Sequence, residues 1–219
     1  MEGIEAVLFD MDGTLVDTEP VGSETMRGFL GKNNIAIGEK DWELFDKIWR
    51  RDGTTVTLEE FVTDVFSRYS TISDIKERIS DFYRDYENNI LFAKPLPGAH
   101  EVLPYLKERY QLALVTASTT SQVKLILERN GWEGIFDAVV SHDDFKRSKP
   151  DPESFVVAAG KLGVPQKRCV VVEDSKNGAL AGKSAGMVVV GVRAGNEREQ
   201  NLSAASVVID TLDGIRDIL

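Results

Sequence analysis

Cysteine and long hydrophobic runs are scarce in this sequence, and each scarcity narrows what the protein can be. Cys169 is the single cysteine in 219 residues, so no internal disulfide can form, which suits a reducing compartment. No apolar run approaches the roughly 20 residues that a membrane-spanning helix needs. The opening stretch MEGIEAVLFD also lacks the basic and long apolar regions of a signal peptide. We therefore expect a cytoplasmic protein without a membrane partner.

Positive charge is outnumbered, since 26 Lys and Arg stand against 36 Asp and Glu, for a net charge of −10. Such a surface repels a phosphate backbone, so nucleic acid is not an expected partner. Hydrophobic residues make up 42% of the chain and charged residues 28%, values typical of a folded globular protein. The length predicts about one to two domains and a core large enough to fold without disulfides.

What the sequence does contain is a series of short β-branched runs that alternate with helical stretches. The runs predict buried parallel strands at 6–10, 112–116, 138–141, 170–174, 188–192 and 207–209. Helices are expected between most of them, at 101–109, 122–130, 153–162 and 176–185. This alternation is typical of βαβ units, so the predicted fold is α/β, with a Rossmann-like, doubly wound parallel sheet.

One long stretch breaks the alternation. Between about Val16 and Ala93 no strand run is evident, whereas apolar residues recur at helical spacing in 44–49, 58–66 and 75–86. The stretch ends at Lys94-Pro95-Leu96-Pro97-Gly98, where prolines stiffen the chain and glycine permits a turn. We therefore predict a core domain from residues 1–14 and 94–219, with an all-helical domain inserted at 15–93.

Polar residues gather where several predicted strands end. Asp10 and Asp12 follow the first strand and project to the same side of an extended chain, which costs energy unless a cation or a proton compensates. Thr116-Ala117-Ser118 ends the second strand, and Glu173-Asp174 ends a later one. Lys149 lies in a proline-flanked loop. Because ligands bind at the carboxyl ends of such sheets, these residues are candidates for one site.

Each of these residues also has an ordinary structural interpretation. The first pair could be a solvated acidic turn, Thr116 a strand-terminal hydroxyl and Lys149 a solvated loop cation. Glu173-Asp174 could cap the following helix, as could Ser175. The functional interpretation rests on the presence of all these residues together in one chain.

In combination, these segments resemble the haloacid dehalogenase superfamily of phosphohydrolases, in the branch that holds β-phosphoglucomutase and phosphoglycolate-phosphatase-like enzymes. The motifs stand in family order along nearly the whole chain, and the helical insertion lies where that branch has its cap domain. The motif residues are Asp10-Met11-Asp12-Gly13-Thr14, Thr116, Lys149 and Glu173-Asp174.

The resemblance implies a role for each motif residue. Asp10 would be the nucleophile that forms an aspartyl phosphate, and Asp12 the general acid and then the base. Thr116 and the backbone N–H of Ala117 would bind the phosphate, which Lys149 would neutralise. Ser118 would contact substrate. The implied cofactor is Mg²⁺, a hard cation that prefers oxygen ligands. Its ligands would be Asp10, the Asp12 carbonyl and Asp174, with Glu173 either a ligand or a partner behind the ligands.

The inserted domain bears on the substrate, which we expect to be a small phosphorylated metabolite hydrolysed by a monomer. Arg51, after Arg50 and before a glycine turn, could bind a substrate anion, or could be an exposed cation at a helix end. Gly22 and Ile79 stand where the mutase branch carries a histidine and a lysine for its second phosphate. The resemblance therefore favours a phosphatase, with a β-phosphoglucomutase-type transferase as the alternative.

Two further classes share parts of the pattern. A receiver-like signalling protein also forms an aspartyl phosphate, but it is shorter and has no helical insertion. A non-catalytic phospholigand-binding protein would have no need of the complete set of catalytic residue types.

Overall fold

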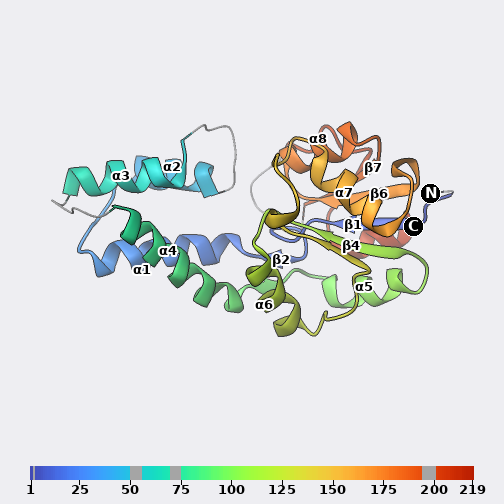
Figure 1. Ribbon diagram of the computed structural model, residues 1–219, viewed down its shortest axis with the longest axis horizontal. Coiled ribbons are helices and arrows are strands. Elements are labelled where there is room, and N and C mark those ends of the chain that lie inside the picture. Colours follow the sequence, from blue (N-terminus) through green and yellow to red (C-terminus); the bar gives the residue numbers. More distant parts are fainter. Residues whose placement is uncertain (2, 50–55, 70–74, 194–200) are drawn as a thin grey trace. The chain divides into compact units, whose positions relative to one another are not determined.

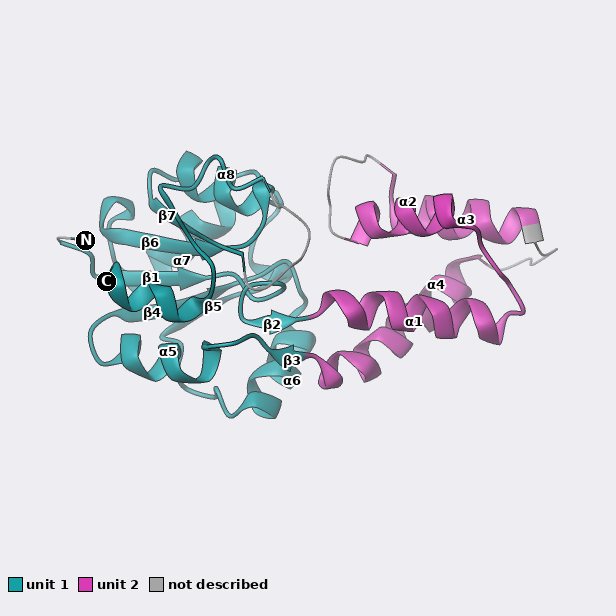
Figure 2. Cartoon of the chain, turned by 180° about the vertical axis from the view of Figure 1, so that it is seen from behind, with its two compact units in different colours: residues 1–17, 94–219 teal, residues 18–93 magenta. Residues whose placement is uncertain are grey.

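The structure is a computed structural model that describes the chain except for residues 2, 50–55, 70–74 and 194–200. It divides into two compact units, residues 1–17 with 94–219, and residues 18–93 (Figure 2). Among the described residues, no helix is both long and apolar enough to cross a membrane.

The first unit is built on a parallel sheet of six strands within the described residues, in the order β5-β4-β1-β6-β7-β8 (Figure 1). Its strands are β1 (Ala6–Phe9), β4 (Gln111–Val115), β5 (Ala138–Val140), β6 (Cys169–Glu173), β7 (Val188–Val192) and β8 (Val207–Ile209). Strand β1 lies in the centre, with Leu8 opposite Ala113 of β4 on one side and Val171 of β6 on the other. Because the strand order reverses at β1, the predicted doubly wound α/β fold is confirmed.

Helices cover both faces of this sheet. Their bounds are α5 (Ala99–Lys107), α6 (Thr120–Asn130), α7 (Glu153–Leu162) and α8 (Lys176–Ser184), and short 3₁₀ turns lie at His142–Asp144, Gln166–Arg168 and Leu212–Asp217. Helices α7 and α8 lie on one face and α5 on the other (Figure 1). Phe155 of α7 and Ala179 of α8 share an apolar cluster with Leu8 of β1. Burial on both faces explains why the strands read as unbroken apolar runs.

The second unit is helical and has its own apolar core. It contains α1 (Glu19–Lys32), α2 (Glu39–Trp49), α3 (Leu58–Tyr69), α4 (Ile75–Asn89) and a 3₁₀ turn at Ile90–Phe92. Its core gathers large rings, including Phe29, Phe45, Phe61, Phe66 and Phe82. The apolar stripes of the sequence predict α2, α3 and α4. They do not predict α1, which contains three glycines along its length and has a proline in its first turn.

A short ribbon corrects the expectation that no strand lies between Val16 and Ala93. Strand β2 (Val16–Asp17) pairs antiparallel with β3 (Lys94–Pro95), and Leu96 N–H donates to the carbonyl of Leu15 at 2.8 Å. Two-residue strands carry no periodicity, so no sequence pattern could indicate them. The ribbon lies where the chain leaves the first unit and where it returns to that unit. That the helical unit is a cap remains a prediction.

Candidate active site

The loop after β1 turns sharply and places Asp10 and Asp12 at the edge of the sheet. Asp10 is the first residue beyond the strand, and its N–H donates to the carbonyl of Val172 on β6 at 3.0 Å. Gly13 has φ +84°, a conformation that side chains rarely adopt, and a Cβ there would overlap the carboxylate of Asp174. The glycine therefore permits both the turn and the close approach of a carboxylate from β6.

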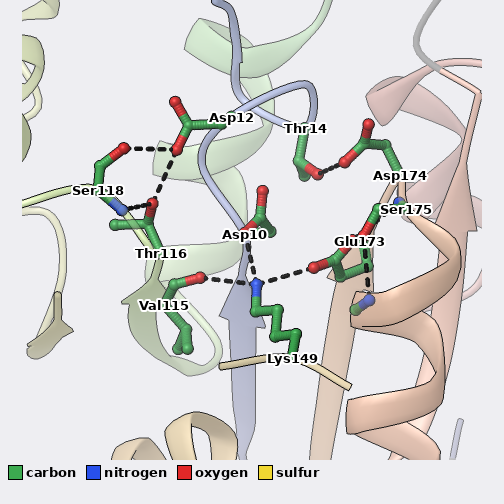
Figure 3. Close-up of polar contacts among 11 residues, drawn as sticks. Asp10, Asp12, Thr14, Val115, Thr116, Ser118, Lys149, Glu173, Asp174 and Ser175 are labelled. Carbon is green, nitrogen blue, oxygen red and sulfur yellow. Dashed lines mark hydrogen bonds and ion pairs between the residues drawn. The ribbon is translucent and has the colours of Figure 1, made fainter. Parts of the chain in front are cut away.

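Lys149 joins three strand ends. Its Nζ donates to Asp10 Oδ1 at 2.5 Å, to the Val115 carbonyl of β4 at 3.1 Å and to Glu173 Oε1 at 2.8 Å (Figure 3). These bonds use all three protons of the ammonium. The side chain is only 11% exposed. Burial would lower the pKa of Lys149, but the carboxylates of Asp10 and Glu173 hold that pKa above its ordinary value. Lys149 is therefore a permanent cation in this site and not a solvated loop residue.

Glu173, 1% exposed, is fixed on both sides of its carboxylate. Oε1 accepts from Lys149, while Oε2 accepts from the N–H and the hydroxyl of Ser175, both at 2.9 Å (Figure 3). A Cβ at Gly178 would overlap this carboxylate, so α8 approaches Glu173 closely only because that position is glycine. Ser175 is also the N-cap of α8, accepting from Gly178 N–H at 3.0 Å. Ser175, which the sequence also offered as a possible cap, therefore caps this helix, and Glu173 does not.

Three buried carboxylates form a cluster that fits a metal ion. Within the described part of the chain, Asp10, Glu173 and Asp174 each offer an oxygen within 4.8 Å of the others. Asp174 also accepts from the Thr14 hydroxyl at 3.1 Å (Figure 3). Three carboxylates against one ammonium leave an excess of buried negative charge, which is costly without a further cation. An all-oxygen donor set is the one that Mg²⁺ prefers, so the residues fit this ion.

The electrostatics of Asp10 reflect that excess. Burial raises the pKa of Asp10 to about 8 against the opposing pull of Lys149, and the neighbouring carboxylates of Glu173 and Asp12 add to the rise. A cation at the cluster would act in the opposite direction and favour the ionised form. In the ionised form, the Asp10 carboxylate could act as a nucleophile.

Asp12 lies on the other side of Asp10 and contacts the end of β4 (Figure 3). Its Oδ2 accepts from the hydroxyls of Thr116 and Ser118, each at 2.8 Å. The N–H of Ser118 in turn donates to Thr116 Oγ1 at 2.9 Å. Ala117 lies between these two residues, and its predicted phosphate contact stays a prediction.

The structure thus brings most of the predicted site residues together at the carboxyl ends of β1, β4 and β6. Arg51 and the other residues of 50–55 lie outside the described residues, so the predicted substrate contact of Arg51 stays a prediction. Sequence reasoning assigned no role to Thr14 or Gly178 and saw Ser175 only as a possible cap. A glycine three residues after a serine cap was a signal of close packing, but nothing in the sequence indicated which side chain it would meet.

Comparisons with known proteins find similar sequences and structures over nearly the whole chain. A family model of haloacid dehalogenase-like hydrolases matches residues 4–186. A phosphorylated carbohydrates phosphatase of Thermotoga maritima is 31% identical over 219 residues, which cover 99% of this chain and 98% of that protein. A bifunctional riboflavin kinase/FMN phosphatase of Arabidopsis thaliana is also 31% identical, over 96% of this chain, but the chain spans only 54% of that protein's length. A crystal structure from Thermotoga maritima, provisionally assigned as a β-phosphoglucomutase, matches with a TM-score of 0.83 at 29% identity, covering 98% of each chain.

Proposed function

The chain belongs to the haloacid dehalogenase-like hydrolases, and we propose that its own reaction is the Mg²⁺-dependent hydrolysis of small phosphorylated metabolites through an aspartyl phosphate. The observation that carries the proposal is the position of Asp10. Asp10 accepts a hydrogen bond from the Lys149 ammonium, belongs to the carboxylate cluster that could hold a metal ion, and stands two residues before a second aspartate, Asp12.

In the proposed reaction, a carboxylate oxygen of Asp10 attacks phosphorus while the bond from phosphorus to the leaving oxygen breaks. Asp12 gives its proton to that leaving oxygen, then takes a proton from the water that hydrolyses the aspartyl phosphate. Lys149 holds Asp10 in place and offsets charge on the phosphoryl group, and Thr116 with the Ala117 N–H binds its oxygens. Mg²⁺ held by Asp10 and Asp174, with the Asp12 carbonyl, would supply the positive charge that phosphoryl transfer requires.

Within this scheme, Glu173 acts as the support of Lys149. Both of its oxygens already accept hydrogen bonds, one from Lys149 and the other from Ser175. A carboxylate that is committed in this way is better suited to stand behind the ligands than to serve as a primary ligand. We therefore assign it to positioning and leave primary coordination to Asp10 and Asp174.

The first test replaces the nucleophile. Asp10→Asn should lower hydrolysis of a phosphomonoester by roughly 10⁴-fold or more and prevent covalent capture of phosphate, because an amide is not a nucleophile. Asp210→Asn is the matched control, since Asp210 is exposed and forms an ion pair with Arg193 at 2.8 Å. Hydrolysis that persists in Asp10→Asn at the wild-type rate would contradict the mechanism.

A sugar phosphate is the favoured substrate class, supported by the Thermotoga maritima relative that acts on phosphorylated carbohydrates. The mutase is the alternative. Gly22 of α1 lies against the indole of Trp49, where even a Cβ would overlap the ring, and Ile79 of α4 packs on the core of the helical unit. Neither position offers a polar side chain for a second phosphate, which favours hydrolysis.

A direct assay separates the two reactions. β-Glucose 1-phosphate with a trace of the 1,6-bisphosphate is supplied, and both free phosphate and glucose 6-phosphate are followed. We expect release of phosphate to exceed formation of glucose 6-phosphate. Fast conversion to glucose 6-phosphate with little free phosphate would establish the mutase instead.

A further inference from the structure

The carboxylate of Asp12 is held in an asymmetric way. Its Oδ2 accepts two hydroxyl hydrogen bonds at 2.8 Å, from Thr116 and from Ser118, whereas Oδ1 points away from both hydroxyls (Figure 3). An oxygen that already accepts two hydrogen bonds has little capacity to carry a proton as well. When Asp12 is protonated, its proton is therefore directed to Oδ1.

The two hydroxyls are not equivalent, because the proposed function uses the Thr116 hydroxyl, and not the Ser118 hydroxyl, to bind phosphate. Thr116 has a single hydroxyl proton, and its oxygen already accepts the N–H of Ser118 at 2.9 Å. If Thr116 turns that proton toward a phosphate oxygen, as the proposed function requires, it gives up its bond to Asp12. The Ser118 hydroxyl then remains the donor that holds Oδ2.

We propose that Ser118 is a positioning residue for the acid–base group Asp12, an assignment that rests on the proposed function and replaces the substrate contact expected from the sequence. Its hydroxyl keeps Oδ2 as an acceptor while phosphate occupies Thr116, so Oδ1–H faces the leaving oxygen. As the phosphorus–oxygen bond breaks, the bonding electron pair passes to the leaving oxygen and the Oδ1 proton joins it. Asp12 is left as the carboxylate that next accepts a proton from water.

This role has a kinetic signature that substrate binding lacks. A general acid matters most for a poor leaving group and least for a leaving group that departs readily as an anion. The experiment therefore uses phenyl phosphates whose ring substituents vary the acidity of the phenol, from 4-nitrophenyl to phenyl. The measurement is the slope of log kcat/KM against the pKa of the phenol, because kcat/KM reports the steps up to release of the first product.

We expect Ser118→Ala to make that slope steeper. Its kcat/KM should fall about tenfold further for phenyl phosphate than for 4-nitrophenyl phosphate, a part of the roughly 10²- to 10⁴-fold that a complete general acid contributes. Ser118→Thr keeps a hydroxyl and should restore the wild-type slope. Asp12→Asn sets the slope for complete loss of the acid. Ser121→Ala is the matched control, because that exposed hydroxyl hydrogen-bonds to the Thr119 hydroxyl at 2.9 Å.

The outcomes separate the two hypotheses. A wild-type protein that cleaves none of these esters overturns the proposed function and this inference with it. A wild-type protein that cleaves them, with Ser118→Ala lowering kcat/KM equally across the series, overturns the positioning role alone and returns Ser118 to substrate binding. Failure of Ser118→Thr to restore the slope, while its thermal stability stays at the wild-type level, would also contradict the role.

Discussion

Lys149 decides how the buried charges of the site are balanced. Its ammonium contacts two carboxylates and one carbonyl, and its aliphatic stem brings Nζ to 4.8 Å from the centre of the Phe155 ring. A flexible loop side chain becomes ordered here because every donor is used and most of its surface is buried. Removing it would leave Asp10 and Glu173 facing each other without a counter-charge.

We expect Lys149→Met to lower both stability and activity. The free energy of unfolding should fall by about 3 kcal/mol, because a buried ion pair loses one partner, and kcat/KM by at least about 100-fold. Lys161→Met is a close control, since Lys161 also contacts a carboxylate and a carbonyl, those of Asp144 and Val139, but is 39% exposed. Its effect on stability should stay below about 1 kcal/mol. Urea unfolding and steady-state kinetics of both variants measure the difference.

At this scale the sequence predicted which residues would meet but not how they would bond. Carboxylates and hydroxyls at strand ends were enough to bring Asp10, Thr116 and Asp174 to one edge, because parallel strands share a direction. The contacts from Ser118 to Asp12 and from Ser175 to Glu173 depend on side-chain rotamers and on loop backbone angles. No pattern in the sequence specifies those variables.

Helix α8 approaches the site more closely than any helix with an ordinary side chain at position 178 could. Gly178→Ala should therefore displace the Glu173 carboxylate, lower the free energy of unfolding by about 2 kcal/mol and reduce kcat. Gly160→Ala in α7 has open space around its Cβ and should instead raise stability by up to about 1 kcal/mol, since alanine favours the helix. Thermal unfolding followed by circular dichroism measures Tm for both variants. If this packing is correct, Tm falls in Gly178→Ala and rises in Gly160→Ala. Equal shifts would contradict it.

Helix α1 makes a comparable close approach in the helical unit. Gly22→His should lower the stability of that unit by about 2 kcal/mol or more, because the Trp49 indole occupies the space the side chain would need. Gly28→His, on the same helix with nothing near its Cβ, should cause no loss. Calorimetry of Gly22→His and Gly28→His measures the two changes in stability. A stable Gly22→His variant that gained mutase activity would show that Trp49 can move aside.

The elements themselves were predictable to different degrees. The buried strand at 188–192 was predicted with correct bounds, because its β-branched run begins shortly after a helix and Gly186. Helix α1 escaped prediction since its glycines at 22, 28 and 31 interrupt the apolar stripe, and glycine at 22 is explained by packing that only the structure reveals. Local propensity and tertiary contact disagree in this helix, and the contact prevails.

For the whole molecule, the negative excess predicts that a divalent cation stabilises the fold. An ion that binds the folded state alone adds about 2.7 kcal/mol when its concentration is 100 times its Kd. We therefore expect Mg²⁺ to raise Tm and a chelator to reverse the rise. Hydrogen exchange should slow at the ends of β1 and β6 and remain unchanged in α3 and α4. Asp174→Asn should abolish the response, whereas the control Asp213→Asn, at an exposed carboxylate that pairs with Arg216, should retain it. A wild-type Tm that does not change when Mg²⁺ is added would argue against the metal site.

The ribbon of β2 and β3 also has an architectural consequence. Because Val16 pairs with Pro95 and Asp17 with Lys94, the chain leaves the first unit and returns to it at adjacent positions. The intervening residues thus form a cassette whose two ends are already joined in register, as in a hairpin whose turn has been expanded into a domain. Such an insert can be exchanged for another without lengthening or twisting the host sheet. The same ribbon offers a natural splice point for grafting a different helical domain onto the unchanged parallel-sheet unit.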